Sequence, residues 1–242
     1  MSERRVVVTG LGATTPLGGD VASTWSALLA GKSGVRLLTE DWRELLPVHF
    51  AARVATEPVD QMERVEMRRL DRSEQFALIA SREAWKDSGA PGVEKERLGV
   101  VIASGIGGVI TLLDQFDNLK EKGPRGVSPH TVPMLMPNGP AANVGLELQA
   151  KAGVHTPVSA CASGAEAIGY ALEMFDARKT LHIGRKSIKA KFVGEPGLHI
   201  QFEVPTNVAI LSTEEDKITR LHSYFEDGSD PDERLQLPQP IM

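Results

Sequence analysis

The chain has 242 residues, of which 41% are hydrophobic and 24% are charged, as is typical of soluble globular domains. Its net charge of -5 disfavours a general nucleic-acid-binding surface. A single cysteine excludes an intramolecular disulfide framework and a cysteine-rich metal site, so we expect a reducing, cytoplasmic compartment and no bound metal. We expect neither a secretory signal nor a membrane span, because no apolar run reaches roughly 18 residues.

Short β-branched runs alternate with helical patterns over the first part of the chain. The segments "RRVVVTGLG" (4–12) and "LGVVIASGIGG" (98–108) predict buried strands that end in glycine turns. Apolar spacing predicts one helix within residues 20–34, with Gly31 as its C-terminal stop, and a second over 71–88, with no hairpin signal, which favours parallel strands covered by helices. The expected apolar faces are Val21, Trp25, Leu28 and Leu29 in the first helix, and Phe76, Ile79, Ala80 and Ala84 in the second.

Two later stretches depart from this pattern. Residues 123–145 are rich in proline and glycine but apolar, which predicts an ordered loop with a short helix that lines a site. From Asp176 onward the pattern changes to alternating residues, typical of an antiparallel meander. The predicted tail strands are 186–194, 197–205, 207–212 and 217–226. We therefore divide the chain into an α/β region, 1–175, and a short antiparallel β-rich tail, 176–242.

The only cysteine, Cys161, lies between a β-branched approach, "TPVSA" (156–160), and an apolar helical pattern. The predicted face of that helix consists of Ala165, Ile168, Leu172 and Phe175. At a strand-to-helix junction, unpaired backbone N–H groups favour a thiolate and can hold the oxyanion formed when the thiolate attacks a thioester. The alternative is a small side chain buried in a crowded core, since free cysteines are often buried and a nucleophile also needs a base.

The segment "GLGATTPLG" (10–18) follows the first predicted strand and invites comparison with a dinucleotide-binding turn. Gly10 and Gly12 fit that pattern, but Thr15 stands where the third glycine belongs. No acidic residue about 20 positions further on ends a second strand. We therefore expect no nucleotide cofactor.

Five segments together resemble the β-ketoacyl-acyl carrier protein synthases, the condensing enzymes of fatty acid and polyketide synthesis. In the family's order they are "VVVTGLGATTPLG" (6–18), "LDRSEQFALIASREAWKDSG" (70–89), "VIASGIGGV" (101–109), "VSPHTVPMLMPNGPAANVG" (127–145) and "VSACASGAEAIGYALEM" (158–174). The resemblance implies the N-terminal half of a thiolase-like fold, a homodimer and no cofactor. It also implies that Cys161 accepts an acyl chain from an acyl carrier protein as a thioester, that its backbone N–H is an oxyanion donor, and that Ile106 lines the acyl pocket.

Arginines recur at Arg64, Arg68 and Arg72, with Arg69 beside them, so a helix there would present a basic stripe on an acidic protein. One interpretation is a solvated face paired with Glu63 and Glu66. The other follows from the resemblance, because this segment matches the family's carrier-facing region. On that interpretation, Arg68 and Arg69 contact the acidic acyl carrier protein.

The family also needs two histidines from its second half, in a His-Gly-Thr and a Gly-Gly-His segment, to decarboxylate a malonyl unit. Neither segment occurs in this sequence, and none of its six histidines is expected to be catalytic: His49, His130, His155, His182, His199 and His222. We therefore expect an incomplete synthase, or alternatively a non-catalytic carrier-binding or dimerisation module. The tail segment 207–226 weakly resembles the polyketide cyclase-like family related to nuclear transport factor 2.

Overall fold

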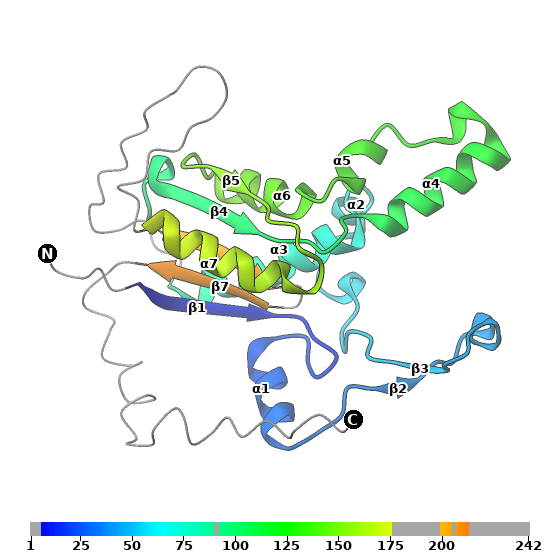
Figure 1. Ribbon diagram of the computed structural model, residues 1–242, viewed down its shortest axis with the longest axis horizontal. Coiled ribbons are helices and arrows are strands. Elements are labelled where there is room, and N and C mark those ends of the chain that lie inside the picture. Colours follow the sequence, from blue (N-terminus) through cyan, green and yellow to red (C-terminus); the bar gives the residue numbers. More distant parts are fainter. Residues whose placement is uncertain (1–5, 90–91, 176–198, 205–206, 213–242) are drawn as a thin grey trace, which may run out of the picture.

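The computed structural model describes residues 6–89, 92–175, 199–204 and 207–212 (Figure 1). The strands are β1 (Val7–Ala13), β2 (Arg36–Leu37), β3 (Phe50–Ala51), β4 (Leu98–Ile102), β5 (Val154–His155), β6 (His199–Val204) and β7 (Asn207–Ser212). The α-helices are α1 (Val21–Leu29), α2 (Arg64–Met67), α3 (Arg72–Asp87), α4 (Val109–Lys122), α5 (Thr131–Leu135), α6 (Gly139–Leu148) and α7 (Ser163–Phe175). Short 3-10 helices are η1 (Asp41–Leu45), η2 (Pro58–Asp60), η3 (Lys95–Arg97), η4 (Pro124–Gly126) and η5 (Ala160–Ala162). No helix in these described ranges is both long and apolar enough to cross a membrane.

The main sheet has the strand order β1-β7-β6-β4-β5. Strand β4 is parallel to both β5 and β6, whereas β7 is antiparallel to β6 and to β1. A hairpin from the tail therefore separates β1 from β4, and the sheet is mixed rather than all parallel. The described parts of two predicted tail strands, residues 199–204 of 197–205 and residues 207–212, form this hairpin, and the other two predicted strands lie outside the described residues. The division of the chain at residue 175 stays a prediction.

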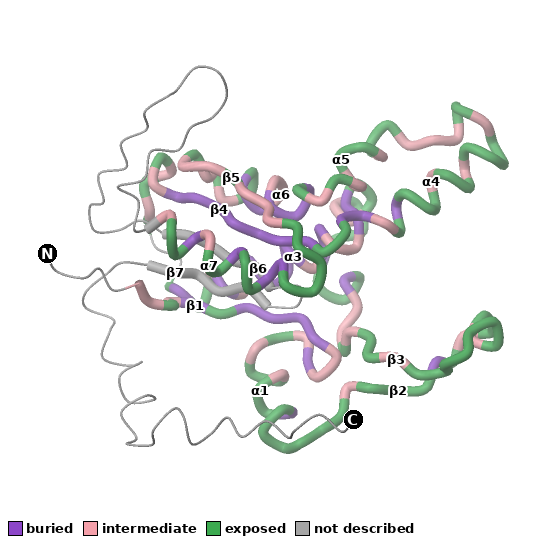
Figure 2. The backbone as a smooth tube through the Cα atoms, viewed as in Figure 1, coloured by how far each residue is buried: buried purple, intermediate pink, exposed green. Residues whose placement is uncertain are grey.

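The core is built on β4, which is buried along its whole length. Side chains of a strand alternate between its two faces. On one face, Val100 and Ile102 pack in a cluster with residues of α3 and α6, while on the other Val101 and Ala103 pack with Ala167 and Ala171 of α7. Figure 2 shows this line of buried residues through the middle of the molecule, with α7 on one side and α3 and α6 behind. The fold is thus a three-layer α/β/α arrangement, as the sequence predicts.

Helix α3 confirms the prediction made for residues 71–88. The Asp71 carboxylate accepts the Ser73 N–H at 2.8 Å, and the Asp71 N–H donates to Glu74 Oε2 at 2.8 Å, which satisfies the first turn of the helix. Gly89 follows the helix at φ +86, a left-handed conformation that glycine adopts without strain. Three of the four residues predicted for its apolar face are buried: Ile79, Ala80 and Ala84.

Strand β1 lies directly against α3, and this contact explains its glycines. A Cβ atom at Gly10 would overlap the carbonyl oxygen of Ala84, and one at Gly12 would overlap that of Ala80. Glycine is therefore required here by close packing of strand and helix, which accounts for the pattern without a bound nucleotide. Carboxylates of α3 complete the contact, because Asp87 accepts the Leu11 N–H and Glu83 accepts the Ala13 N–H, both at 2.9 Å.

The faces predicted for α1 and α7 are wrong. In α1 only Ala27 is buried, while Trp25, Leu28 and Leu29 are exposed. In α7 the exposed side chains include Ile168 and Leu172, and the helix instead packs on the sheet through the small residues Ala167 and Ala171. Small side chains allow a helix to approach the sheet closely. The larger apolar side chains then face outward, where no described part of the chain covers them.

Helix α4 was not predicted, whereas the ordered loop at 123–145 is confirmed. The loop contains η4, α5 and the start of α6. Helix α4 and the segment that follows it extend away from the sheet (Figure 1). The exposed apolar side chains of α4 are Ile110, Leu112, Leu113, Phe116 and Leu119.

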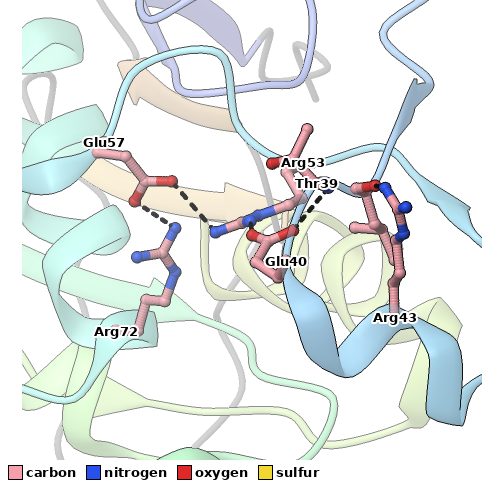
Figure 3. A network of polar contacts seen from close by, with 7 residues as sticks. Thr39, Glu40, Arg43, Arg53, Glu57 and Arg72 are labelled. Carbon is pink, nitrogen blue, oxygen red and sulfur yellow. Dashed lines mark hydrogen bonds and ion pairs between the residues drawn. The ribbon is translucent and has the colours of Figure 1, made fainter.

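A second segment that extends from the sheet consists of residues 36–57, and ion pairs connect it to α3 (Figure 3). Arg53 pairs with Glu40 and lies 3.8 Å from Glu57, and Glu57 in turn pairs with Arg72 at 2.6 Å. The Arg72 guanidinium also stacks on the Phe76 ring, 4.9 Å from its centroid. The first turn of α3 thus holds the segment 36–57 in place.

Glu74 is the largest buried charged side chain of the fold, with 1% of its surface exposed. Its Oε1 has no hydrogen-bond partner in the described part of the chain and lies against Gly139. Burial raises the pKa of this carboxyl to about 7, and the neighbouring Asp71 carboxylate adds to the rise. The folded protein therefore binds this proton more tightly than the unfolded chain does.

We predict that this carboxyl makes the protein less stable as pH rises. Its contribution is fully present below the unfolded pKa of 4.5 and is lost as pH rises through about 7. The loss is up to about 3 kcal/mol between pH 5 and pH 8. Urea unfolding should show Glu74→Gln gaining stability relative to the wild type over this interval. The exposed Glu121→Gln should follow the wild type, and a Glu74→Gln curve parallel to the wild type would contradict the prediction.

Candidate active site

Two loops meet at one edge of the sheet. Residues 104–108 follow β4, and residues 156–162 follow β5. Because β4 and β5 are parallel, both loops leave the sheet at the carboxyl ends of the strands, where α/β proteins commonly bind ligands. The first loop carries Ile106 and the second carries Cys161. The structure therefore brings the neighbourhoods of two predicted site residues together.

Cys161 is exposed and lies in the turn η5, directly before α7. The predicted strand approach is too long, because β5 ends at His155. The N–H of Ala162 donates to the Ser159 carbonyl at 3.1 Å, and that of Ser163 donates to the Ala160 carbonyl. The backbone N–H of Cys161 has no hydrogen-bond partner in the described residues. An exposed thiol beside a free backbone donor disagrees with the interpretation of Cys161 as buried filler.

The residue before the cysteine has a strained backbone. Ala160 has φ +51, and apart from Gln149 it is the only non-glycine residue with positive φ in the described ranges. An L-residue in this conformation costs about 1–2 kcal/mol, because its Cβ approaches the carbonyl oxygen. Such strain persists only where surrounding contacts hold it, and it is often found at functional sites.

The loop that carries Ile106 is held by its own contacts. The Ser104 hydroxyl accepts the Gly107 N–H at 2.8 Å, and Gly107 has φ +79. A Cβ atom at Gly108 would overlap the Met134 carbonyl, so the loop lies tightly against α5. Ile106 itself is 68% exposed, and its role in an acyl pocket stays a prediction.

Asp71 connects this loop to the start of α3. Its carboxylate accepts the Thr111 hydroxyl at 2.7 Å and lies 3.3 Å from the Thr111 N–H, in the first turn of α4. Both residues are buried. The helix that follows the glycine loop is therefore fixed by the same carboxylate that caps α3.

The predicted basic stripe is only partly correct. Helix α2 ends at Met67 and a separate helix starts at Arg72, because Leu70 is buried between them and Asp71 caps α3. Arg72 pairs with Glu57 and so leaves the stripe. Arg68 and Arg69 are exposed and make no ion pair with other described residues.

The pairing proposed for a solvated face also differs from the structure. The Glu66 carboxylate pairs with Arg82 at 2.5 Å, and Arg82 pairs with Glu147 at 2.6 Å. These hydrogen bonds raise the pKa of the Arg82 guanidinium, so it stays charged. Glu66 is therefore engaged elsewhere, and the two arginines of the turn remain available to an acidic partner.

No histidine supplies a base to Cys161 within the described residues. His49 is exposed and its Nε2 contacts the Leu46 carbonyl at 3.0 Å, and His130 is exposed at the start of α5. His155 lies against Tyr170, with Nδ1 3.4 Å from the phenol oxygen, and burial lowers its pKa. The side chains of His182, His199 and His222 lie outside the described part of the structure. Nor do three His, Cys, Asp or Glu side chains gather as a metal site among the described residues.

The part of the chain that contains both loops and the cysteine turn matches a known family. The family description "Beta-ketoacyl synthase, N-terminal domain" matches residues 3–180. The chain belongs to the β-ketoacyl synthase N-terminal domain family. A relative, the 3-oxoacyl-[acyl-carrier-protein] synthase 2 of Mycobacterium leprae (strain TN), is 45% identical over 168 residues, covering 69% of this chain and 40% of the relative. This β-ketoacyl synthase chain thus spans less than half the length of that relative.

Solved ketosynthase structures share the fold. "The ishigamide ketosynthase/chain length factor" matches with a TM-score of 0.70 at 20% identity, covering 90% of this chain and 60% of the other. The complex "AntDE:AntF (apo): type II PKS acyl-carrier protein in complex with its ketosynthase bound to the hexaketide" matches with a TM-score of 0.62 at 17% identity, covering 90% and 65%. At these identities the matches concern the fold, and they confirm the expected thiolase-like α/β architecture.

The structure adds contacts at the site that the sequence did not indicate. The position of Asp71 at a helix start was predictable, because an aspartate followed three residues later by Glu74 is typical of a helix start. Its bond to Thr111 was not, since the two residues are distant in sequence. Ala160 and Ser163 also gave no signal, because neither residue type reveals a left-handed turn or a buried hydroxyl.

We predict that Asp71→Ala lowers the free energy of unfolding by about 3 kcal/mol, because it removes a helix cap and a buried charged acceptor. Thr111→Val removes only one donor and should cost about 1 kcal/mol. Urea unfolding of both single variants and the double variant measures the coupling. The double variant should be about as unstable as Asp71→Ala alone, whereas fully additive losses would show that the two side chains act independently.

Proposed function

We propose that this chain carries out the acyl-loading step of a 3-oxoacyl-acyl carrier protein synthase, with Cys161 as the acyl-accepting nucleophile. One observation carries the proposal. Cys161 is exposed on a strained turn, its own backbone N–H has no partner among the described residues, and this turn lies at the edge where the glycine loop also ends. Family membership supports the reaction class, and the residues present support this one step.

In the proposed step, the Cys161 thiolate attacks the carbonyl carbon of an acyl thioester on the carrier. A new C–S bond forms as the carbonyl becomes a tetrahedral oxyanion, which the free N–H of Cys161 stabilises. The intermediate collapses with release of the carrier thiol, whose sulfur takes up a proton. This step involves no redox change and no cofactor.

The proposal ends before condensation. Carbon–carbon bond formation in this family requires loss of carbon dioxide from a malonyl unit, and the resemblance assigns that step to two histidines. The 242 residues contain neither of the matching segments, and among the described residues no hydrogen bond joins a histidine to Cys161. We therefore propose acyl transfer, in fatty acid or polyketide synthesis, without malonyl decarboxylation by this chain's own residues.

The proposed partner is an acyl carrier protein. In the AntDE:AntF structure a ketosynthase is in complex with an acyl-carrier protein. Arg68 and Arg69 are exposed cations without an ion-pair partner in the described part of the chain, and they lie next to Asp71, whose carboxylate fixes the helix that follows the glycine loop. We also propose a homodimer, because the outward apolar side chains of α4 are of the kind that subunit contacts cover.

We predict that incubation with an acyl carrier thioester adds one acyl group to Cys161. Intact-mass measurement should show the added mass on the wild type and none on Cys161→Ser, since a hydroxyl is the weaker nucleophile. Cys161→Ala should still bind the carrier, which separates loading from docking. Carrier binding without any adduct on the wild type would support the alternative, a non-catalytic carrier-binding module.

Removing the two cations should weaken docking. We predict that Arg68→Ala combined with Arg69→Ala lowers carrier affinity by about tenfold at low salt, and that the difference shrinks as salt screens the charges. Fluorescence anisotropy of a labelled carrier measures this. The matched control, Arg36→Ala with Arg125→Ala, removes the same charge from other exposed positions. Equal losses in both double variants would point to net charge rather than to a docking site.

A further inference from the structure

The hydroxyl of Ser163 is the most completely enclosed polar group beside the cysteine turn. Ser163 is 0% exposed, although it is only two residues from the exposed Cys161. Its oxygen accepts the Ser159 N–H at 2.9 Å, and its proton is directed to the Ala160 carbonyl at 2.7 Å. The Ser104 carbonyl of the glycine loop lies 3.5 Å from the same oxygen. One side chain therefore contacts both ends of the turn and the neighbouring loop.

These bonds hold the strained residue. The left-handed conformation of Ala160 is strained, and the turn must recover this cost from its contacts. The two bonds of Ser163 flank that residue, one on the amide that precedes it and one on its own carbonyl. A Cβ atom at Gly105 would lie 3.4 Å from the Ala160 oxygen, so the glycine loop lies close to the same carbonyl. Without the hydroxyl, the Ser159 N–H loses its partner, the Ala160 carbonyl keeps only the Ser163 N–H, and less of the strain is offset.

We propose that Ser163 is a positioning residue for Cys161: its hydroxyl fixes Ala160 in the left-handed conformation, and this aims the thiol and the free N–H of Cys161 at one substrate carbonyl. The proposal rests on the proposed function of Cys161. Ser163 touches neither the substrate nor the thiol, and it acts only through the turn. Its loss should therefore slow the reaction of bound substrate and leave carrier docking unchanged.

The test compares Ser163→Ala with Ser159→Ala. Both remove a serine hydroxyl from the same turn, but the Ser159 hydroxyl has no partner in the described residues. The acylation rate at saturating carrier should fall at least about tenfold in Ser163→Ala, because small misplacements of a nucleophile are costly. The half-saturating carrier concentration should change less than about twofold, and Ser159→Ala should match the wild type.

A rescue separates positioning from general stability. Glycine adopts positive φ without strain, so Ala160→Gly should restore most of the rate in the Ser163→Ala background. The unfolding midpoint, measured in parallel, should remain lowered, because the buried oxygen is still missing. If Ser163→Ala alone does not fold, its effect on the acylation rate is measured in the Ala160→Gly background, where the rate should fall by less than about threefold.

A second readout does not depend on the carrier. Iodoacetamide alkylation of Cys161 should slow by at least about threefold in Ser163→Ala and recover in the double variant, because the displaced turn no longer holds the thiol in its exposed position. Absence of an acyl adduct on the wild type would refute the proposed function, and alkylation would still test Ser163. Wild-type rates in Ser163→Ala, or no recovery with Ala160→Gly, would overturn the positioning role.

Discussion

Burial of β4 on both faces is the constraint on which the rest of the structure depends. Since Val100 and Ile102 face one helical layer while Val101 and Ala103 face the other, helices must cover both faces of the strand, which pairs with β6 and β5 on its two sides. Its direction then decides where the glycine loop emerges. The parallel partner β5 places the cysteine turn at the same edge. The position of the site is thus a consequence of core packing, and the loops supply only its details.

The start of α3 holds that edge together at a cost in stability. Asp71 contacts the first turn of its own helix and the first turn of α4, so one carboxylate sets the spacing of two helices. This arrangement places Glu74 in the interior with an unpartnered oxygen and a pKa raised to about 7. A buried, poorly paired carboxyl is destabilising when charged. The contact with Gly139 shows why the neighbouring segment cannot close further around it, since the backbone already lies against Oε1.

Short sequence patterns predicted the elements whose formation depends on neighbouring residues. Strand β4 and helix α3 were predictable because one is a continuous apolar run and the other has a start signal, an apolar face and a glycine stop. The exposed face of α7 was not, because the helix packs through Ala167 and Ala171 and turns its larger side chains outward. The sequence did not indicate that Arg72 pairs with Glu57 and so lies apart from the basic stripe, because the two residues are distant in sequence. The place of the tail hairpin between β1 and β4 likewise depends on pairings across long stretches of chain, which no short pattern records.

The same limit applies to the site, where residue types and geometry carry different information. Cys161 and the glycine loop could be found because their residue types are distinctive, while the turn that aims the thiol depends on an alanine and a serine that are unremarkable in sequence. Among the nucleophilic side chains of proteins, cysteine depends least on a paired base, because a few per cent of free cysteine is thiolate near neutral pH. Acyl transfer therefore needs little beyond aim and a backbone donor. Decarboxylation is different, because negative charge develops on the thioester enolate that remains after carbon dioxide leaves, and the resemblance assigns its stabilisation to two histidines whose segments this sequence lacks. The proposed acyl transfer thus requires fewer catalytic groups than decarboxylation would.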